Sequence, residues 1–503
     1  ALSPGQFPQK ISRLTMSFTV SVALLSGHLA NVEVLPSQSV EELKRAAAQV
    51  LGRPLTALAF QGRRLLRGDT LKDLGLQDGG VVSAVVRQPG SVLCGHRRSG
   101  AFAALKKDGL VATWGHPDCG GDSRNVQEKL VNVSQLYASS CAFAAINEEG
   151  EVIAWGDPAY GGDCQSVASE LTGHVQHIHA SQRAFAAVRT DGRVVAWGSG
   201  LCGGDCSAVQ AQLYQVKSLV ATHRAFAALR YDGAVITWGH AQCGGDSTAV
   251  KSQLVDVQEV YATETAFAAL RSDGKVVAWG DVLCGGEVGS ARDRLDNVSA
   301  IYTSNKAFAA VKYDGTVVTW GKAISGGDCS AVQDKLVDVQ HIYCGHAMAA
   351  LRGDGSVVTW GHSQFGGDSR DVQDQLLDVQ QIFATDAAFA ALKTDGSVVS
   401  WGHGEYGGDS SKIQDQLTAI QSIQATSAAF AALRQDGTVL TWGLAHKGGD
   451  SSSVQDQLQN VEEIASSYGA FAALRSDGVV VTWGDANYGG DSAPVQPLVV
   501  EKF

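Results

Sequence analysis

Nine aspartates that follow Gly-Gly pairs are the residues of this sequence whose spacing most invites a chemical role. They recur at intervals of about 41 residues: Asp122, Asp163, Asp205, Asp246, Asp328, Asp368, Asp409, Asp450 and Asp491. A ring of such carboxylates could bind calcium, which prefers oxygen ligands. Each aspartate also precedes a short segment of the VQxxL type, where its side chain would cap the first turn of a helix. We favour the capping interpretation and expect no metal site and no cofactor.

Cysteines and histidines also recur at fixed places. The cysteines that share one slot are replaced there by tyrosine or phenylalanine in other copies: Cys119, Cys202, Cys243 and Cys284. This interchange indicates a semi-buried apolar position rather than a disulfide framework. Four histidines follow Trp-Gly and are interpreted as surface loop residues: His116, His240, His362 and His403. The sequence has no EF-hand loop, zinc spacing, P-loop, nucleophile elbow or HExxH motif, so we expect no catalytic residue.

The variable residues are the four between each Trp-Gly and the next Gly-Gly. They read HPDC, DPAY, SGLC, HAQC, DVLC, KAIS, HSQF, HGEY, LAHK and DANY. Recognition residues usually lie on loops carried by a rigid scaffold. We therefore select the aromatic members as candidate partner-binding residues: Tyr160, Phe365, Tyr406 and Tyr488. Local packing beneath the loop is an equally good interpretation of these side chains.

The elements that position these residues form an internal repeat, which decides the fold of residues 91–503. Ten copies begin at Ala101, Ala142, Ala184, Ala225, Ala266, Ala307, Ala347, Ala388, Ala429 and Ala470. All ten tryptophans occupy one equivalent position: Trp114, Trp155, Trp197, Trp238, Trp279, Trp320, Trp360, Trp401, Trp442 and Trp483.

One copy is expected to hold three short strands: AFAAL, VVxWG with a buried tryptophan, and a closing VxxIxA. An Asp-Gly pair such as Asp232-Gly233 predicts a type I′ hairpin turn between the first two. A unit of this size cannot bury both of its faces alone, so it must stack on its neighbours.

The ends of the repeat region favour a ring over a linear stack. Residues 91–95 resemble a closing strand without its beginning, and the last copy stops at VQPLVVEKF without such a strand. A ring sealed by its own first strand would have these ends, and closure removes exposed sheet edges. We predict a mainly β propeller of about ten three-stranded blades, with a single closed ring favoured and seven plus three blades as the alternative.

A different pattern precedes the repeats. Residues 1–15 are polar and are expected to be a disordered extension. Residues 16–88 predict a small α+β domain of the order ββαβ…β, with a helix that presents Val40, Leu43, Ala47 and Val50 on one face.

The segments LPSQSVEELK, LAFQGRRLLRGDTLKDLGLQDGG and VVSAVVR resemble ubiquitin in order and spacing. The resemblance implies a β-grasp fold. It places the recognition patch of ubiquitin on Leu25, Ala59 and Val85, with Ser83 where the family has histidine. Ala59 is smaller than the family's residue and would reduce the contact area of an interface. We retain Leu25 and Val85 as candidate partner-binding residues of a docking module.

The motif DGxVxxWGxxxxGG with VxxIxA resembles the regulator of chromosome condensation repeat and the related β-lactamase inhibitory propeller. The resemblance implies a β-propeller, although seven blades are usual in that family. Gly-Gly-Asp also replaces the customary Gly-Gln and following proline.

Charge narrows the choice of partners. The formal net charge is −12, and it arises in the repeats because residues 1–15 and 16–88 each carry two more basic than acidic side chains. An acidic array disfavours nucleic acid, whose binding depends on clustered Lys and Arg. No apolar run approaches the length of a membrane helix, and no signal peptide is recognised, so we expect an intracellular protein, cytoplasmic or nuclear, without membrane insertion.

These features together favour a non-enzymatic scaffold or adaptor that binds protein partners through the propeller loops. One alternative is an adaptor of the ubiquitin pathway, because the repeats also occur in ligases of the HERC type. Another is a regulator of guanine-nucleotide exchange or chromatin binding.

Overall fold

The structure is a computed structural model of the 503-residue chain. It describes residues 18–24, 29–36, 38, 40, 43, 46–47, 50, 55–60, 63–64, 71–72, 74, 76, 80–86, 92–95, 100–106 and 109–491. The chain divides into two compact units, Ala1–Gly90 and Ser91–Phe503. The extension predicted at residues 1–15 lies outside the described residues. No helix among the described residues is long and apolar enough to cross a membrane.

The first unit contains one five-stranded sheet of order β2-β1-β5-β3-β4. Its strands are β1 (Phe18–Leu24), β2 (Leu29–Val34), β3 (Leu55–Phe60), β4 (Arg63–Arg64) and β5 (Gly80–Val86). The outer hairpins are antiparallel, whereas the central pair β1 and β5 is parallel. The chain between β2 and β3 contains helical residues. Strands on different parts of such a sheet are commonly joined by a helical crossover.

The core of the first unit joins the sheet to this helical segment. Val40, Leu43 and Ala47 are buried against strand residues such as Val20 and Val82. These three helical positions therefore agree with the apolar face predicted from the sequence. Val50 is 62% exposed and is not part of this core, although on a regular helix its spacing places it about 20° from the buried Leu43.

The described residues of the second unit form ten three-stranded antiparallel sheets, each continuous in sequence. We number them from sheet 1 (β6-β7-β8) to sheet 10 (β33-β34-β35). Their first strands are β6 (Val92–Gly95), β9 (Val133–Ala138), β12 (Val175–Ala180), β15 (Val216–Ala221), β18 (Val257–Ala262), β21 (Val298–Thr303), β24 (Val339–Cys344), β27 (Val379–Ala384), β30 (Ile420–Ala425) and β33 (Val461–Ser466).

The middle strands carry the AFAAL motif. They are β7 (Ala101–Leu105), β10 (Ala142–Asn147), β13 (Ala184–Arg189), β16 (Ala225–Arg230), β19 (Ala266–Arg271), β22 (Ala307–Lys312), β25 (Ala347–Arg352), β28 (Ala388–Lys393), β31 (Ala429–Arg434) and β34 (Ala470–Arg475). The third strands carry the tryptophan. They are β8 (Val111–Gly115), β11 (Val152–Gly156), β14 (Val194–Gly198), β17 (Val235–Gly239), β20 (Val276–Gly280), β23 (Val317–Gly321), β26 (Val357–Gly361), β29 (Val398–Gly402), β32 (Val439–Gly443) and β35 (Val480–Gly484).

Two short 3-10 segments follow each third strand in most of the sheets. The first set is η1 (Pro117–Cys119), η3 (Pro158–Tyr160), η5 (Gly200–Cys202), η7 (Ala241–Cys243), η9 (Val282–Cys284), η11 (Ala323–Ser325), η13 (Ser363–Phe365), η15 (Gly404–Tyr406), η17 (Ala445–Lys447) and η19 (Ala486–Tyr488). The second set is η2 (Gln127–Lys129), η4 (Gln165–Glu170), η6 (Ser207–Gln212), η8 (Thr248–Gln253), η10 (Gly289–Arg294), η12 (Ser330–Lys335), η14 (Gln373–Gln375), η16 (Gln414–Gln416) and η18 (Gln455–Gln457).

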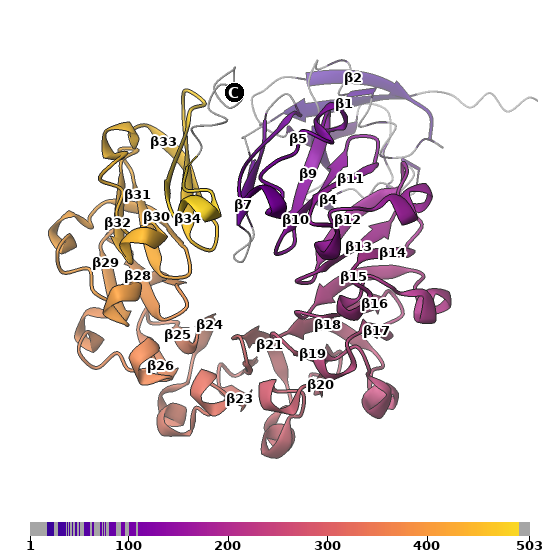
Figure 1. Ribbon diagram of the computed structural model, residues 1–503. Coiled ribbons are helices and arrows are strands. Elements are labelled where there is room, and N and C mark those ends of the chain that lie inside the picture. The colour runs from indigo at the N-terminus through magenta and orange to yellow at the C-terminus, as the bar shows by residue number, and fades with distance from the viewer. Residues whose placement is uncertain are drawn as a thin grey trace, which may run out of the picture. The chain divides into compact units, whose positions relative to one another are not determined.

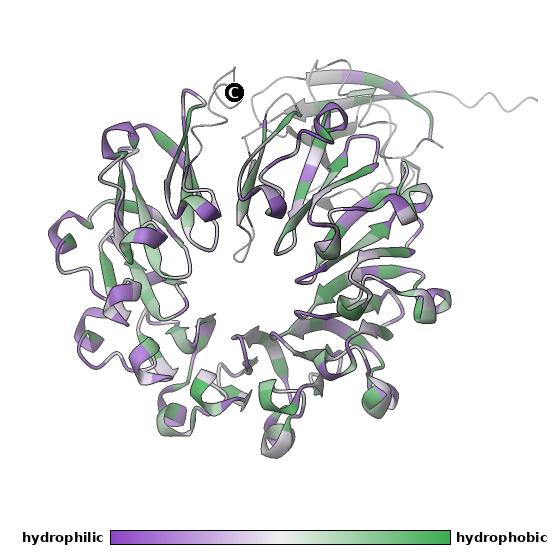
Figure 2. Cartoon of the chain, in the orientation of Figure 1, coloured by the Kyte–Doolittle hydropathy of each residue, from purple (hydrophilic) through white to green (hydrophobic). Residues whose placement is uncertain are grey.

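The prediction of a mainly β region built from repeated three-stranded sheets is confirmed. In the second unit the sheets follow one another around a common centre in the order of the sequence, from β7 to β34 (Figure 1). Hydrophobic residues concentrate along their strands, while many of the connecting segments are hydrophilic (Figure 2).

The grouping of strands differs from the one expected. Each VxxIxA strand pairs with the AFAAL strand that follows it, so it opens a sheet instead of closing the preceding copy. The segment predicted to seal a ring is β6, which pairs with β7 inside sheet 1. No strand exchange between the first and last sheets is therefore formed by the described residues. The connection from VxxIxA to AFAAL is short enough for direct antiparallel pairing, which outcompetes a distant partner.

The Asp-Gly hairpins form as predicted, but their turns are not of type I′. In sheet 4, Gly233 donates its N–H to Arg230 O at 3.0 Å, and only Gly233, with φ of 78°, has positive φ in this turn. A type I turn followed by a left-handed glycine produces this arrangement. The Asp232 carboxylate accepts the Ala234 N–H at 3.1 Å, which favours the turn further.

The core lies between neighbouring sheets. Every tryptophan that was predicted to be buried is at most 5% exposed. Between sheets 4 and 5, Phe267 and Trp279 stack at 5.3 Å and pack against small residues such as Ala225 and Ala227 of the preceding sheet. The indole N–H of Trp279 then donates to Gly244 O of sheet 4 at 3.0 Å.

The same indole-to-glycine bond recurs between all consecutive sheets, at 2.9 to 3.1 Å. Sheets 10 and 1 are joined in the same way, because Trp114 Nε1 donates to Gly489 O at 3.1 Å. Phe102 and Trp114 of sheet 1 share a core cluster with Ala470 and Leu474 of sheet 10. The first and last sheets of this unit therefore pack against each other as the internal pairs do.

Candidate partner-binding rim

The segments that vary from copy to copy lie at one end of the strands. We call this end the variable rim and define it as the first set of 3-10 segments together with the connections from first to middle strands. In sheet 5, Asp281 N–H donates to Thr265 O at 3.0 Å, and Thr263 Oγ1 donates to Cys284 O at 3.1 Å. These bonds hold both ends of η9 against the sheet and leave its middle residues exposed.

The connections of neighbouring sheets are joined by backbone hydrogen bonds along this rim. Gln182 N–H donates to His223 O at 3.0 Å, His223 N–H to Glu264 O at 2.8 Å, and Glu264 N–H to Asn305 O at 2.9 Å. The rim of sheets 3 to 6 is thus a continuous band, and its backbone is fixed while its side chains differ.

The four aromatic residues selected from the sequence all lie on the variable rim and are half-buried. Tyr160, Tyr406 and Tyr488 pack at the edges of core clusters. The local packing considered from the sequence is therefore present for these three. Their role in partner binding stays a prediction.

Each candidate has neighbours that the sequence did not reveal. The Arg183 guanidinium of sheet 3 lies 4.5 Å from the Tyr160 ring and donates to its hydroxyl at 2.8 Å. Lys447 Nζ of sheet 9 lies 4.4 Å from the Tyr488 ring of sheet 10. Such contacts join residues about 20 to 40 positions apart, and no local pattern signals them.

Phe365 lies at the centre of a histidine cluster on sheets 7 and 8. Its ring stacks on His362 at 4.0 Å and lies 5.8 Å from His346 and 6.3 Å from His403. The Nδ1 atoms of His362 and His403 are buried without a hydrogen-bond partner among the described residues, as is that of His240. These three histidines are half-buried, so their interpretation as loop residues at the surface holds only in part.

The candidates on the first unit are less well described. Leu25 lies outside the described residues. Val85 belongs to β5 and pairs with Ala57, and Ala59 of β3 pairs with Ser83. The backbone register therefore places positions 59, 83 and 85 on adjacent strands, and the recognition role of Leu25 and Val85 stays a prediction.

The recurrent aspartates support turns. Asp246 accepts the N–H of Thr248, two residues ahead, at 2.9 Å, and equivalent bonds recur at Asp122, Asp163, Asp205, Asp328, Asp368, Asp409 and Asp450. Hydrogen bonds from Thr248 hold the pKa of Asp246 below its ordinary value. The segments that follow are 3-10 helices, so the carboxylates stabilise the turn before each segment. No group of three or more His, Cys, Asp or Glu that could hold a metal ion occurs among the described residues.

The shared cysteine slot is semi-buried to buried, as the sequence indicated. Cys202, Cys243 and Cys284 are buried, and Cys119 is half-buried. The ten cysteines are free thiols. Burial raises the pKa of the Cys94 and Cys344 thiols, which lie on the first strands, to about 12.

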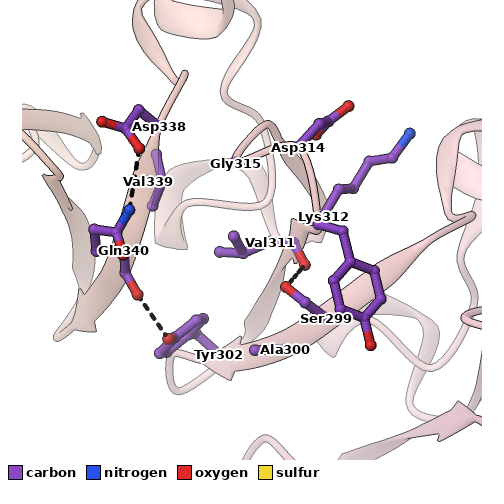
Figure 3. Close-up of a pocket in the computed structure, with 11 residues that line it drawn as sticks. Ser299, Ala300, Tyr302, Val311, Lys312, Asp314, Gly315, Asp338, Val339 and Gln340 are labelled. Atoms are coloured by element: carbon purple, nitrogen blue, oxygen red, sulfur yellow. Dashed lines mark hydrogen bonds between the residues drawn. The ribbon is translucent and has the colours of Figure 1, made fainter.

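A pocket of about 340 Å³ lies at the other end of the strands, between sheets 6 and 7. Figure 3 shows Tyr302, Gln340 and Asp338 along its edge. The Tyr302 hydroxyl donates to Gln340 O at 3.5 Å, and Gln340 Nε2 donates to Asp338 Oδ1 at 3.0 Å. These polar groups are satisfied by one another, so we place the candidate site on the variable rim instead.

Comparison with known proteins gives the most direct support to the domain predicted for the first unit. Residues 18–89 match the family model described as ubiquitin family, which confirms the predicted ubiquitin-like domain. No curated protein matches the chain. The solved structure of Prp20p from Saccharomyces cerevisiae, described with its binding properties to Gsp1p and histones, is similar at 20% identity over 48% of this chain and 74% of that chain, with a TM-score of 0.31. A TM-score of this size does not establish a shared architecture.

Proposed function

We propose that this chain is a non-enzymatic protein-binding scaffold, in which the variable rim holds a protein partner and the ubiquitin-like domain serves as a docking module. One contrast supports this proposal. The indole-to-glycine bond that joins neighbouring sheets recurs in every copy, whereas the four residues between Trp-Gly and Gly-Gly differ in all ten. A rigid frame with variable loops at one end is a common basis for recognition.

We also infer that the ten sheets are the blades of one closed ring. The pairing of sheets 10 and 1 through Trp114 and Gly489 supports this inference. Seven plus three blades would interrupt the series after sheet 7. Trp401 of sheet 8 nevertheless donates to Gly366 O of sheet 7 at 3.0 Å, like its equivalents.

Exchange of the indole protons tests the ring. In a closed ring, the Trp114 indole N–H is as protected from deuterium as that of Trp279, because both are buried and bonded to a glycine carbonyl. NMR of the labelled tryptophans measures both rates in one sample. Fast exchange at Trp114 alone would show an open array.

Site-specific photo-crosslinking of the full chain tests the scaffold. A photoreactive residue is placed at Leu283 or Glu405 on the variable rim, and at Tyr313 on a hairpin at the other end as the matched control. All three positions are exposed. We expect mass spectrometry to identify the same protein partner from at least one rim position and not from the control. Equal capture at all three positions, or none on the rim, would contradict the proposal.

A further inference from the structure

Large aliphatic side chains protrude from the variable rim on sheets 3, 5 and 6. Leu201 is 77% exposed, Val282 61%, Leu283 75% and Ile324 49%. They occupy the middle two of the four variable positions between Trp-Gly and Gly-Gly, within η5, η9 and η11. The residue that ends each of these segments is buried beneath them, as for Cys284 at 5%. The aliphatic side chains therefore have no access to the core and extend into solvent.

These side chains are concentrated on one part of the rim. The same middle positions hold proline, aspartate, alanine, serine, glutamine, glycine, glutamate, histidine or asparagine in the other segments of the first set. No exposed large hydrophobic residue occurs there in the described part of sheets 7 to 10. Exposed apolar residues that gather in one area indicate an interaction site more strongly than scattered ones.

Basic residues accompany the aliphatic ones. Arg183 and Arg224 precede the middle strands of sheets 3 and 4, Lys306 precedes that of sheet 6, and Lys322 begins the variable segment of sheet 6. None of these four is in an ion pair with another described residue. At the opposite ends of the strands the basic residues are neutralised locally, as in the pair Arg271 and Asp273 at 3.1 Å.

The acidic residues within this area have internal partners. The Asp281 carboxylate accepts the Leu283 N–H at 2.9 Å and the Thr265 hydroxyl at 3.2 Å. Glu264 lies 3.8 Å from His223 Nε2. The rim segments of sheets 3 to 6 themselves thus carry four basic and two acidic side chains, a net charge of +2 (4 − 2), although the chain as a whole carries −12.

We propose that the rim of sheets 3 to 6 is a docking surface for an acidic protein segment that carries aliphatic side chains. This inference rests on the proposed scaffold function and names the chemistry of its partner. The aliphatic residues of the segment bury against Leu201, Val282, Leu283 and Ile324, while its carboxylates face the four basic side chains. Charge complementarity of this kind favours orientation and rapid encounter, and apolar burial supplies affinity.

Binding of designed peptides to the full-length chain tests the surface. The probe is a fluorescent synthetic peptide of about 16 residues in which Glu and Asp alternate with Leu and Ile. One comparison peptide replaces the aliphatic residues with serine, and another replaces the acidic residues with lysine. We expect fluorescence anisotropy to show binding of the first peptide only, weakened by salt because exposed charges are screened.

Matched variants locate the binding. We expect Leu283→Ser with Lys322→Glu to weaken binding of the probe by about tenfold or more, because it removes apolar burial and reverses one charge. Tyr313→Ser with Lys275→Glu makes an equivalent change on exposed residues at the hairpin end and should leave binding unchanged. Circular dichroism of both variants verifies that each retains the fold.

Three outcomes would overturn the inference: no binding of the acidic aliphatic peptide, equal binding of the serine peptide, or equal loss in both variants. Light scattering adds a fourth, since a wild-type dimer that Leu283→Ser with Lys322→Glu converts to a monomer would make a second copy the occupant. Partner capture from Glu405 but not from Leu283 in the crosslinking experiment would leave the scaffold proposal standing and refute this surface.

Discussion

At the scale of single residues, the residue immediately before the first strand of most sheets adopts a left-handed backbone conformation. Eight non-glycine residues at these positions in the described chain have φ between 49° and 56°. Most are Asn or Asp, which enter the left-handed region more readily than other non-glycine residues. Their carbonyls accept hydrogen bonds from neighbouring hairpins, as Asp256 O does from Ser272 N–H at 2.9 Å. Gln215 and Ala419 are the two that depart from this preference.

Ala419 has φ of 54°, so a substitution at this position should increase the stability of the protein. We expect Ala419→Asn to raise the free energy of unfolding by about 0.5–1 kcal/mol, because asparagine tolerates this conformation better than alanine. Urea unfolding followed by tryptophan fluorescence measures the change. The reverse substitution at the equivalent position, Asn460→Ala, is the matched control and should destabilise by a similar amount. A loss of stability in Ala419→Asn, or a gain in Asn460→Ala, would show that side-chain contacts, and not backbone strain, dominate here.

Thiol reactivity is a second prediction for individual residues. Because burial raises the pKa of Cys344 to about 12, almost none of this thiol is ionised at pH 8. The thiolate is the reactive species, so we expect iodoacetamide to modify Cys344 much more slowly in the folded protein than in guanidinium chloride. Mass spectrometry of the digested protein measures both rates. Equal rates of modification in the folded protein and in guanidinium chloride would mean that β24 opens readily in the folded state.

At the scale of elements, the bond from each tryptophan to a glycine carbonyl couples two sheets through one short segment. Gly244 has φ of 92°, and a Cβ there would lie 2.4 Å from the ring of Phe267 in the next sheet. The glycine is thus required both by its backbone conformation and by the closeness of the neighbouring sheet. The repeat uses Gly-Gly at this place because two sheets meet there, and not only because the chain bends.

This requirement predicts a large effect for Gly244→Ala. We expect a loss of about 2–5 kcal/mol in the free energy of unfolding, which combines left-handed strain with overpacking against a buried ring. Gly353→Ala is the control: its Cβ would also approach an atom to 2.4 Å, but that atom is Oδ2 of Asp338, whose side chain can move, and φ at Gly353 is not positive. The control should cost less than about 1 kcal/mol. Thermal unfolding measures the loss of stability in both variants.

At the scale of the whole molecule, many of the acidic side chains of the repeats lie in turns and accept hydrogen bonds there. Carboxylates that accept N–H bonds recur before the 3-10 segments and in the hairpins, and these bonds hold their pKa values below the ordinary 3.8, as at Asp328 and Asp395. The folded state therefore binds fewer protons than the unfolded state in this range. The stabilisation is complete above pH 4 to 5 and is lost as the pH falls through the lowered values.

We accordingly expect the urea midpoint to be nearly constant from pH 7 to pH 5 and to fall steeply below about pH 4. Asp246→Asn with Asp328→Asn keeps an oxygen acceptor in each turn but removes two titrating groups. The fall of the midpoint with pH should be shallower in this variant than in the wild type. An unchanged midpoint at pH 3 would show that these hydrogen bonds do not stabilise the native state.

Much of this architecture follows from local patterns. The period of about 41 residues predicted repeated sheets, and the alternation around each tryptophan predicted its burial. The Asp-Gly pairs predicted hairpins such as that of β16 and β17. The turn type was wrong because a left-handed glycine after a type I turn satisfies the same sequence. Of the candidate site, the position of the aromatic residues on one rim was predictable, whereas the basic and aliphatic surface of sheets 3 to 6 was not.

The sequence by itself determined the β-rich repeat, its buried aromatic residues and the ubiquitin-like domain, because each depends on neighbours close in the chain. Only the tertiary structure decided which strands share a sheet, which carbonyl each indole bonds, and which variable side chains adjoin. Trp114 and Gly489, for example, are 375 residues apart. Contacts of that kind depend on how all of the intervening sheets pack, and no local pattern of residue types encodes them.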